Sequence, residues 1–357
     1  MTSRERVLKT LQGGTPDRVP RFDSPWSETL VRWRQEGLGE DEDLAQRFGF
    51  DFAVIPALDL SFGFPVQVVE DCDEYTIQRD ANGVLRKDIR RESGHTPQWL
   101  DHTIKTRHDW ERHRERLTWR EDRVPAGSRD QLAAAKAKGL FVAIWGVEAY
   151  EAAWPVWGQV GIFTQMMDDP ALVEEVFATY TDMIIAGAQH LLDSGTDFDG
   201  AWFSGDLGYR NSQLFSPRLY EELLMPHHTR MCEFFAHHGK PVILHSCGRI
   251  QELIPRFIKA GFAAIQPLEA KAGQDVRELK REYGKDIVFF GNIDVRRMSG
   301  TREELREELL SKLRVAADGG YMYHSDHSVP PTVSWENYCY LMALLEEHGA
   351  YAEANAA

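Results

Sequence analysis

The stretch PVILHSCGRIQELIPRFIKAG, residues 241–261, decides how the fold of this chain is interpreted. It begins with three consecutive apolar residues, 242–244, as a buried strand does. It then continues into a segment with helical apolar spacing that ends at Gly261, where a helix C-cap is expected. Between these two parts the chain carries an imidazole and a thiol two positions apart, at His245 and Cys247.

The same order of strand and helix recurs along the chain of 357 residues. Alternating strands and amphipathic helices are typical of a parallel sheet, because each helix carries the chain back to the start of the next strand. Eight strands predict an α/β fold of the TIM type, a (β/α)₈ barrel, as a single domain over residues 1–357. A doubly wound open sheet is the alternative, although its glycine-rich dinucleotide motif is missing from the sequence. The predicted strands are residues 18–23, 52–57, 140–146, 200–206, 241–247, 263–269, 287–294 and 320–326.

A long segment, residues 58–139, separates the second predicted strand from the third. It contains a predicted hairpin over residues 74–93, with Asn82 and Gly83 at its turn. A loop of this length without structure is unusual in a compact domain. We therefore expect a folded insertion after the second strand that partly covers the mouth of the barrel.

The charge of the chain argues against several classes of partner. It has 41 basic and 56 acidic residues, a formal charge of −15, which repels nucleic acid and anionic membranes. No run reaches 18 apolar residues, and the first residues lack the apolar region of a signal peptide. Four scattered cysteines make a disulfide framework improbable. We expect a cytoplasmic protein that binds neither nucleic acid nor membrane.

Polar side chains accumulate where the predicted strands end. Active sites of (β/α)₈ barrels lie at the carboxyl ends of the strands, and folding alone does not require such an accumulation. The residues concerned are Asp23, Asp59, Glu148, Asp206, His245, Cys247, Glu269, Asn292, Asp294, His324, Asp326 and His327.

His245 and Cys247 are the strongest candidates for metal ligands. Residues two apart in an extended strand point the same way, so both side chains can reach one ion. Nitrogen and sulfur ligands suit Zn²⁺, and a catalytic zinc usually has three protein ligands. His327 is the predicted third ligand, with His324 and Glu269 as alternatives. The pair alone is a weak signal, since a helix-capping histidine beside an inert buried cysteine has the same sequence.

Four stretches in the second half of the chain resemble the uroporphyrinogen decarboxylase superfamily, and ERVLKTLQGGTPDRVP, residues 5–20, resembles its usual opening. The resemblance extends from about residue 2 to 349 and implies a (β/α)₈ barrel. The four stretches are HSCGRI from 245, IQPLEAKAGQDV from 265, VFFGNID from 288 and GGYMYHSDHSVPPTVSWENY from 319.

The resemblance is closer to the zinc-dependent, corrinoid-linked methyltransferases than to the true decarboxylases. The decarboxylases carry an Arg-x-Ala-Gly-Arg stretch for propionates, whereas this chain has PRFDSPWSE at residues 20–28. The methyltransferases place His-x-Cys after a strand, matched by His245 and Cys247, and a further ligand after the last strand. In the branch that methylates thiols this last ligand is a cysteine, whereas here it is His327.

A zinc site with one thiolate and two imidazoles is a stronger Lewis acid than one with two thiolates, which suits oxygen substrates. The expected reaction is O-demethylation of a methoxylated small molecule, with an aromatic ring among the candidates, and transfer of the methyl group to a corrinoid (cobalamin). The sequence lacks the Asp-x-His-x-x-Gly stretch that binds corrinoids, so a partner protein would supply it. A decarboxylase or lyase of a small acid or tetrapyrrole, and a non-catalytic barrel that binds a tetrapyrrole or corrinoid, are the alternatives.

The remaining candidate residues follow from this chemistry. Breaking an ether requires an acid, and Asp206 is the first choice, followed by Glu148 and His324. Core packing and a structural role in the loops are the competing interpretations of these side chains. Whether the chain forms a homodimer stays open at this stage. Trp145, Trp202 and Tyr209 are the predicted walls of the substrate site.

Overall fold

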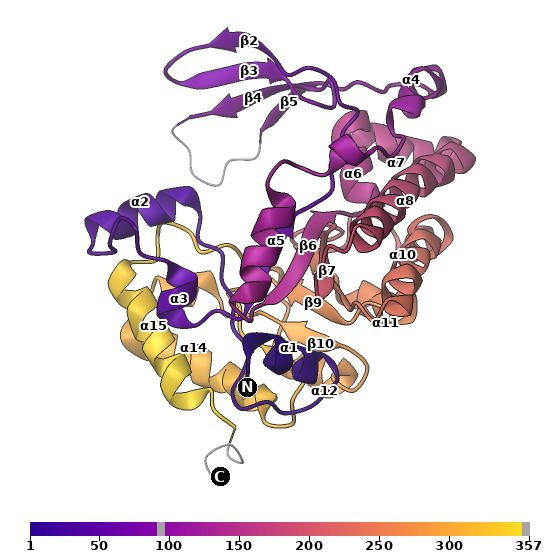
Figure 1. The fold of residues 1–357 in the computed structure, drawn as a ribbon. Coiled ribbons are helices and arrows are strands. Elements are labelled where there is room, and N and C mark those ends of the chain that lie inside the picture. The colour runs from indigo at the N-terminus through magenta and orange to yellow at the C-terminus, as the bar shows by residue number, and fades with distance from the viewer. Residues whose placement is uncertain (91–96, 352–357) are drawn as a thin grey trace.

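Seven parallel strands form one curled sheet at the centre of the molecule (Figure 1). The computed structural model describes residues 1–90 and 97–351. Along the sheet each strand pairs with the next one in the chain, apart from the insertion between β1 and β6, so the sheet turns steadily in one direction. The strands are, in order, β1 (Phe52–Pro56), β6 (Phe141–Val147), β7 (Gly200–Ser204), β8 (Val242–Ser246), β9 (Ala264–Pro267), β10 (Val288–Phe290) and β11 (Tyr321–Met322).

Helices pack around the outside of this sheet and connect its strands (Figure 1). Several begin at a side-chain cap, as at Thr301, which accepts a hydrogen bond from Glu304 N at 3.2 Å. The helices are α1 (Ser3–Leu11), α2 (Ser27–Gln35), α3 (Leu44–Phe48), α4 (Arg107–His113), α5 (Ser128–Ala137), α6 (Ala149–Trp157), α7 (Gln159–Asp168), α8 (Pro170–Asp193), α9 (Pro217–Leu219), α10 (Met225–His237), α11 (Ile254–Ala260), α12 (Val276–Tyr283), α13 (Val295–Met298), α14 (Arg302–Leu313) and α15 (Trp335–His348).

Both faces of the sheet are buried, which explains why its strands are apolar runs rather than alternating ones. On β8, Val242 and Leu244 pack into the layer between the sheet and the helices. Ile243 points to the other face and packs into an inner core. Aromatic rings fill much of this inner core, with Phe52 stacked on Phe290 at a centroid distance of 5.0 Å. The interior of the curled sheet is therefore a packed core at one end.

The predicted first strand, residues 18–23, is not a regular strand. Its residues lie between β11 and β1 and make only isolated contacts: Phe22 N donates to Tyr323 O at 3.2 Å, and Asp51 N donates to Arg21 O at 2.9 Å. Pro20 is one cause of this irregularity, because proline has no amide hydrogen for a ladder. The central sheet of the described residues has seven strands. The prediction that residues 18–23 form a regular eighth strand is therefore wrong.

The last three strands are shorter than the sequence predicts. The chain leaves extended geometry just after each strand, at Leu268 (φ 64°) after β9 and at Gly291 and Asn292 (φ 137° and 80°) after β10. Asn292 accepts a hydrogen bond from Val276 N and donates to two carbonyl oxygens, which holds this turn in place. The polar residues that seemed to end the strands therefore lie in the loops that follow them.

The segment between β1 and β6 contains a second sheet of four antiparallel strands, β2 (Gln67–Asp71), β3 (Tyr75–Arg79), β4 (Leu85–Ile89) and β5 (Gln98–Asp101) (Figure 1). The predicted hairpin is β3 and β4, and Gly83 at its turn has φ 75°. Residues 91–93 of that prediction lie outside the described residues. Trp99 of β5 and Val147 at the end of β6 line one cavity, so the second sheet lies at the carboxyl ends of the central strands.

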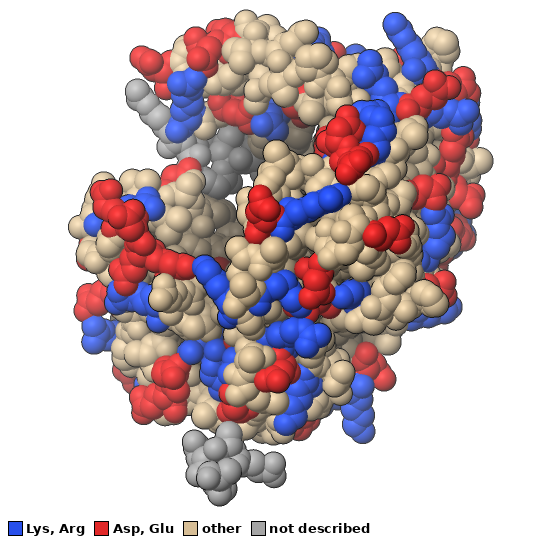
Figure 2. Space-filling view, viewed as in Figure 1, with Lys and Arg blue, Asp and Glu red and all other residues tan. Residues whose placement is uncertain are grey.

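The surface is consistent with the mixed but acidic composition. Figure 2 shows acidic and basic side chains interspersed over the face that it displays. Among the helices of the described residues, none is both long enough and apolar enough to span a bilayer.

A buried carboxylate joins the first helix to the start of the sheet. Asp51, fully buried just before β1, accepts hydrogen bonds from Arg6 Nη1 at 2.6 Å and Arg18 Nη1 at 2.7 Å. It also accepts hydrogen bonds from Arg18 Nη2 at 3.0 Å and from the backbone N–H of Arg21 at 2.8 Å. One side chain thus ties α1 and the segment between β11 and β1 to the edge of the sheet.

We predict that Asp51→Asn destabilises the protein by about 3 kcal/mol, because half-buried Arg18 loses its carboxylate partner and buried Arg6 keeps only Asp17. Urea unfolding followed by circular dichroism measures this change. Glu307→Gln, on an exposed face of α14, is the control and should shift stability by less than about 0.5 kcal/mol. Equal effects of the two substitutions would contradict the role given to Asp51.

Candidate functional site

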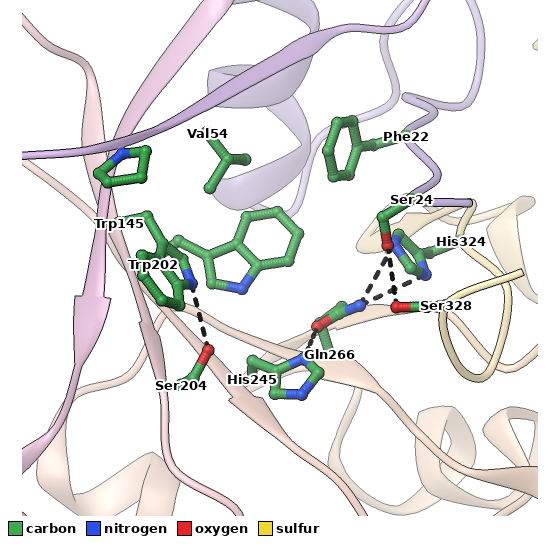
Figure 3. Close-up of a pocket in the computed structure, with 11 residues that line it drawn as sticks. Phe22, Ser24, Val54, Trp145, Trp202, Ser204, His245, Gln266, His324 and Ser328 are labelled. Carbon is green, nitrogen blue, oxygen red and sulfur yellow. Dashed lines mark hydrogen bonds between the residues drawn. The ribbon is translucent and has the colours of Figure 1, made fainter. Parts of the chain in front are cut away.

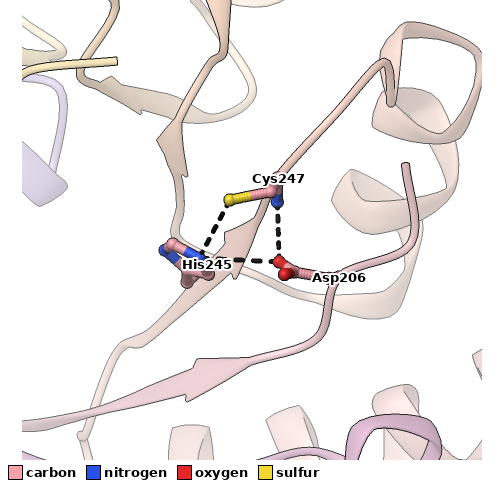
Figure 4. Close-up of side chains that lie close together, drawn as sticks. All are labelled: Asp206, His245 and Cys247. Atoms are coloured by element: carbon pink, nitrogen blue, oxygen red, sulfur yellow. Dashed lines mark hydrogen bonds and ion pairs between the residues drawn. The ribbon is translucent and has the colours of Figure 1, made fainter. Parts of the chain in front are cut away.

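His245 and Cys247 lie together at the end of β8 (Figure 4). The Nε2 atom of His245 is 3.4 Å from Cys247 Sγ and 3.5 Å from Asp206 Oδ1. Asp206 follows β7 and also accepts a hydrogen bond from Cys247 N at 2.9 Å. These three side chains form one group of candidate metal ligands, with their ligand atoms within 4.8 Å of one another.

A second group of candidate ligands shares Cys247 with the first. It adds Glu269, which follows β9, and His327, which follows β11. The Oε1 atom of Glu269 is 3.9 Å from His327 Nε2, and its Oε2 atom accepts a hydrogen bond from Gly248 N at 3.0 Å. The three ligands that the sequence predicts are thus divided between two groups that meet at Cys247. Glu269, an alternative in the sequence analysis, joins them.

The charges around Cys247 favour a cation at this point. Burial raises the pKa of the Cys247 thiol well above its ordinary value, and the carboxylates of Asp206 and Glu269 raise it further. Lys271 Nζ lies 3.1 Å from Glu269 Oε1 and offsets part of the negative charge. A thiol, two imidazoles and two carboxylates converge here, and such a donor set fits a divalent metal such as zinc.

His324 belongs to neither group. It is buried, and its Nδ1 atom lies 2.6 Å from the carbonyl oxygen of Ser325, to which it donates a hydrogen bond. Burial lowers the pKa of His324, so the ring is neutral. Its ring nitrogens lie 3.3 Å from Gln266 Nε2, and Gln266 Oε1 lies 2.5 Å from His245 Nδ1. His324 therefore contacts the metal candidates through Gln266.

An aromatic cavity of about 320 Å³ lies beside His245, and we call it the central cavity (Figure 3). Trp145 and Trp202 form one wall, as predicted for a substrate site, and Trp145 Nε1 donates to Ser204 Oγ at 3.2 Å. Tyr209 lies elsewhere. Within residues 1–90 and 97–351, the residues that line the central cavity include neither Lys nor Arg: they are Phe22, Ser24, Val54, Pro56, Trp145, Trp202, Ser204, His245, Gln266, His324 and Ser328.

A second cavity of about 520 Å³ is lined by Cys247, and we call it the outer cavity. Tyr209, Cys247 and Glu269 line it, together with three cationic side chains, Arg210, Lys271 and Arg296. The candidate ligands therefore contact two spaces of different character, one aromatic and one charged.

The side chain of Glu148 stabilises the beginning of α6. Its fully buried carboxylate caps α6 by accepting hydrogen bonds from Tyr150 N at 2.9 Å and Glu151 N at 2.8 Å. It also lies 2.9 Å from His228 Nε2. The predicted catalytic role of Glu148 therefore receives no support from its position.

Glu151, three residues later, is the acid that the sequence analysis missed. It lines a third cavity, with Trp99, Trp145 and Trp154, and its Oε2 atom accepts a hydrogen bond from Asp206 N at 3.1 Å. Burial raises the pKa of Glu151 to about 8, with the charge of Asp206 as the next cause. Glu151 lies three residues after Glu148, in the first turn of the helix that Glu148 caps, and this spacing could have indicated a second carboxylate near the same strand end.

The other polar residues after the strands hold loops together. Asp326 accepts hydrogen bonds from Val295 N and Ala270 N, both at 2.9 Å. Asp23 accepts one from the hydroxyl of Tyr323 at 3.0 Å. Further loop contacts of this kind are made by Asp59, Asn292 and Asp294.

Curated relatives of this chain are uroporphyrinogen decarboxylases of low identity. That of Nostoc punctiforme is 23% identical over 216 residues, 58% of this chain and 57% of the relative. That of Myxococcus xanthus is 26% identical over 188 residues, 52% of this chain and 50% of the relative. The chain thus spans about half the length of the curated relatives it matches.

A solved structure supports the fold over nearly the whole chain. A methyltransferase from Methanosarcina mazei superposes with a TM-score of 0.65 at 14% identity, covering 97% of this chain and 99% of that one. The sequence pattern of the family Uroporphyrinogen decarboxylase (URO-D) matches residues 151–348, which is more than half of the chain. The chain therefore belongs to the uroporphyrinogen decarboxylase (URO-D) family.

Proposed function

We propose that this chain is a zinc-dependent methyltransferase that demethylates a methoxylated small molecule and passes the methyl group to a corrinoid carried by a partner protein. The observation that carries the proposal is the convergence of nitrogen, sulfur and oxygen ligands on Cys247, next to an aromatic cavity. The methyltransferase of Methanosarcina mazei, similar in fold over nearly the whole chain, supports the reaction class.

His245 and Cys247 would supply two of the zinc ligands, and His327 or Glu269 the third. The negative charge of Asp206 and Glu269 disfavours a free thiolate at Cys247, and a bound cation removes this cost. When bound, zinc would supply Lewis acidity toward the oxygen of the ether.

The central cavity would hold the substrate. Its volume of about 320 Å³ lies at the lower end of the range for small-molecule sites. The indole rings of Trp145 and Trp202 offer flat apolar surface for an aromatic ring, with favourable stacking energy of about 1 kcal/mol. The lack of Lys and Arg in its walls favours a substrate that is neutral where it enters the cavity.

The second candidate function is a decarboxylase, which the matches to curated decarboxylases favour. A tetrapyrrole with many carboxylates would need cationic partners in the cavity, and the described residues that line it provide none. Arg21, the arginine nearest to the missing motif, instead pairs with Glu346 at 2.6 Å and donates to Gly49 O at 3.2 Å. The cavity therefore supports the methyltransferase better.

Asp206 is the proposed relay that passes a proton to the oxygen that loses its methyl group. Its carboxylate is about half exposed and lies 3.5 Å from His245 Nε2, close to the place where the reacting oxygen would lie. Glu151, which contacts Asp206 and holds its proton at neutral pH because of its raised pKa, is a proton reserve beside it.

The proposal also includes the domain organisation of the chain and the place where a corrinoid protein would approach. We propose a single domain in which residues 20–22 take the place of the eighth strand between β11 and β1. The four-stranded sheet β2–β5 would then border the approach of the corrinoid protein, because Trp99 lines a cavity with the end of β6.

We predict about one zinc per purified chain, measured by metal analysis after dialysis. Cys247→Ala should lower the affinity for Zn²⁺ by more than about 100-fold, because it removes the ligand common to both groups. Cys72→Ala, in the four-stranded sheet region, is the matched control and should keep the metal. His327→Ala and Glu269→Gln identify the third ligand. Stoichiometric zinc in Cys247→Ala at unchanged affinity would refute the site.

We predict methylation of cob(I)alamin by a methoxylated arene in the presence of the zinc-loaded protein. Absorbance at the bands of cob(I)alamin and methylcobalamin follows the reaction for a panel of methoxyarenes. Asp206→Asn should slow turnover by about 100-fold or more if its proton is used in the rate-limiting step. Trp145→Ala should raise KM more than it lowers kcat, because it removes binding surface.

Two results would count against this activity. One is a failure to methylate cobalt with free cobalamin and with a corrinoid protein encoded beside this chain. The other is formation of coproporphyrinogen from uroporphyrinogen at an enzymatic rate, detected by chromatography. Glu307→Gln serves as the neutral control for all activity measurements.

We predict a pH-dependent stability that depends on Glu151. The folded protein holds this proton up to about pH 8, whereas a free glutamate releases it near pH 4.5. The contribution of this proton to the free energy of unfolding is therefore largest below pH 4.5 and is lost as the pH rises through about 8. Glu151→Gln stays neutral, so its stability relative to the native chain should rise by about 2–3 kcal/mol between pH 5 and pH 9.

Urea unfolding of the zinc-free protein at both pH values, in the presence of a chelator, measures this difference. A relative stability of Glu151→Gln that is the same at pH 5 and pH 9 would show that Glu151 is already ionised in the folded protein at pH 5.

A further inference from the structure

Gln266 is a buried polar side chain in the interior of β9, between Ile265 and Pro267. It is 3% exposed, and β8 and β9 pair so that its Cα lies opposite that of His245. A buried amide is costly unless its donor and acceptor atoms both have partners. Its amide reaches both His245 and His324, across the floor of the central cavity (Figure 3).

The direction of these hydrogen bonds follows from the carbonyl of Ser325. A carbonyl oxygen only accepts, so the Nδ1 atom of His324, 2.6 Å away, carries the hydrogen. The amide nitrogen of Gln266 lies 3.3 Å from Nε2 and can only donate, so Nε2 is the acceptor and carries no hydrogen. The amide nitrogen is equally far from Nδ1, but the hydrogen of that atom is already directed at Ser325.

The same orientation of the amide determines the state of His245. With its nitrogen toward His324, Gln266 presents Oε1 to His245 Nδ1 at 2.5 Å, and Nδ1 must donate. The Nε2 atom of His245 then keeps its lone pair, 3.4 Å from Cys247 Sγ. This lone pair is the ligand atom that a metal would use.

We infer that Gln266 is a positioning residue that fixes His245 in the Nδ1–H tautomer and directs its Nε2 lone pair toward Cys247. The role of Gln266 in metal binding rests on the proposed function. Its effect on the tautomer of His245 does not depend on that proposal. An amide suits the position because it accepts from His245 and donates to His324 at once. A carboxylate would keep the first bond and lose the second, since His324 Nε2 has no hydrogen to give.

Three variants separate this role from simple packing. Gln266→Leu removes both bonds and keeps an apolar side chain of similar size. Gln266→Glu keeps an acceptor for His245 Nδ1. Ser204→Ala is the matched control, because Ser204 also lines the central cavity and lies opposite His245 in the sheet, but its hydroxyl bonds Trp145 and no histidine nitrogen. Circular dichroism checks that each variant folds, and Gln266→Met replaces the leucine variant if that one does not.

The first measurement is the tautomer of His245 in the metal-free protein, from two-bond ¹⁵N–¹H correlation spectra with ¹⁵N-labelled histidine. A His245→Gln spectrum assigns the signals. We expect the Nδ1–H form in the native chain, Ser204→Ala and Gln266→Glu, and its loss as the dominant form in Gln266→Leu. A different tautomer in the native chain, or an unchanged tautomer in Gln266→Leu, overturns the inference.

The second measurement is the affinity for Zn²⁺ by competition with a chromophoric chelator. We expect Gln266→Leu to bind about 10–100-fold more weakly than the native chain, and Gln266→Glu to recover most of the affinity. Equal affinity in the native and leucine variants overturns the role of Gln266 toward the metal. If the native chain binds no zinc, the proposed function fails, and the tautomer measurement still decides the role of Gln266 toward His245.

Discussion

The ion pairs of Asp51 are the constraint on which the shape of this protein depends. A sheet of seven parallel strands has two free edges, and here β1 and β11 are brought together across the segment that contains Arg18 and Arg21. That segment has few ladder bonds of its own, so the buried carboxylate supplies much of what holds it. The curl that follows brings the loop after β11, with His327, to the same place as the loop after β8.

The candidate metal ligands come together because the loops that carry them follow strands of the same sheet. Cys247 directly follows β8, Asp206 lies in the loop after β7 and Glu269 in the loop after β9, so neighbouring strands in the sheet deliver neighbouring ligands. His327 reaches the same point from β11, which is not a neighbour, and it does so only because the sheet curls. Without the curl the first group of ligands would persist and the second would lose a member.

The sequence predicted the alternation of strands and helices, and with it the parallel sheet, because apolar periodicity records burial directly. It also predicted that His245 and Cys247 share a face. It could not separate exposed from buried carboxylates: Glu148 and Asp326 follow strands as Asp206 does, but they are fully buried, whereas the carboxylate of Asp206 is about half exposed. That difference depends on contacts between residues distant in the chain. Gln266 was overlooked for the same reason, since its two partners lie 21 and 58 positions away.

The two neighbouring candidate ligands His245 and Cys247 line different cavities, and this bears on the kind of reaction that the site suits. His245 lines the central cavity, and Cys247, 3.4 Å from it, lines the outer one. A group transfer requires two molecules to reach one point, whereas a decarboxylation requires a single substrate and its acid. The aromatic walls of the central cavity and the cationic walls of the outer cavity also favour different occupants, since Arg210, Lys271 and Arg296 attract anions. Two cavities of different character at adjacent ligands therefore suit transfer between two different molecules better than the loss of carbon dioxide from one.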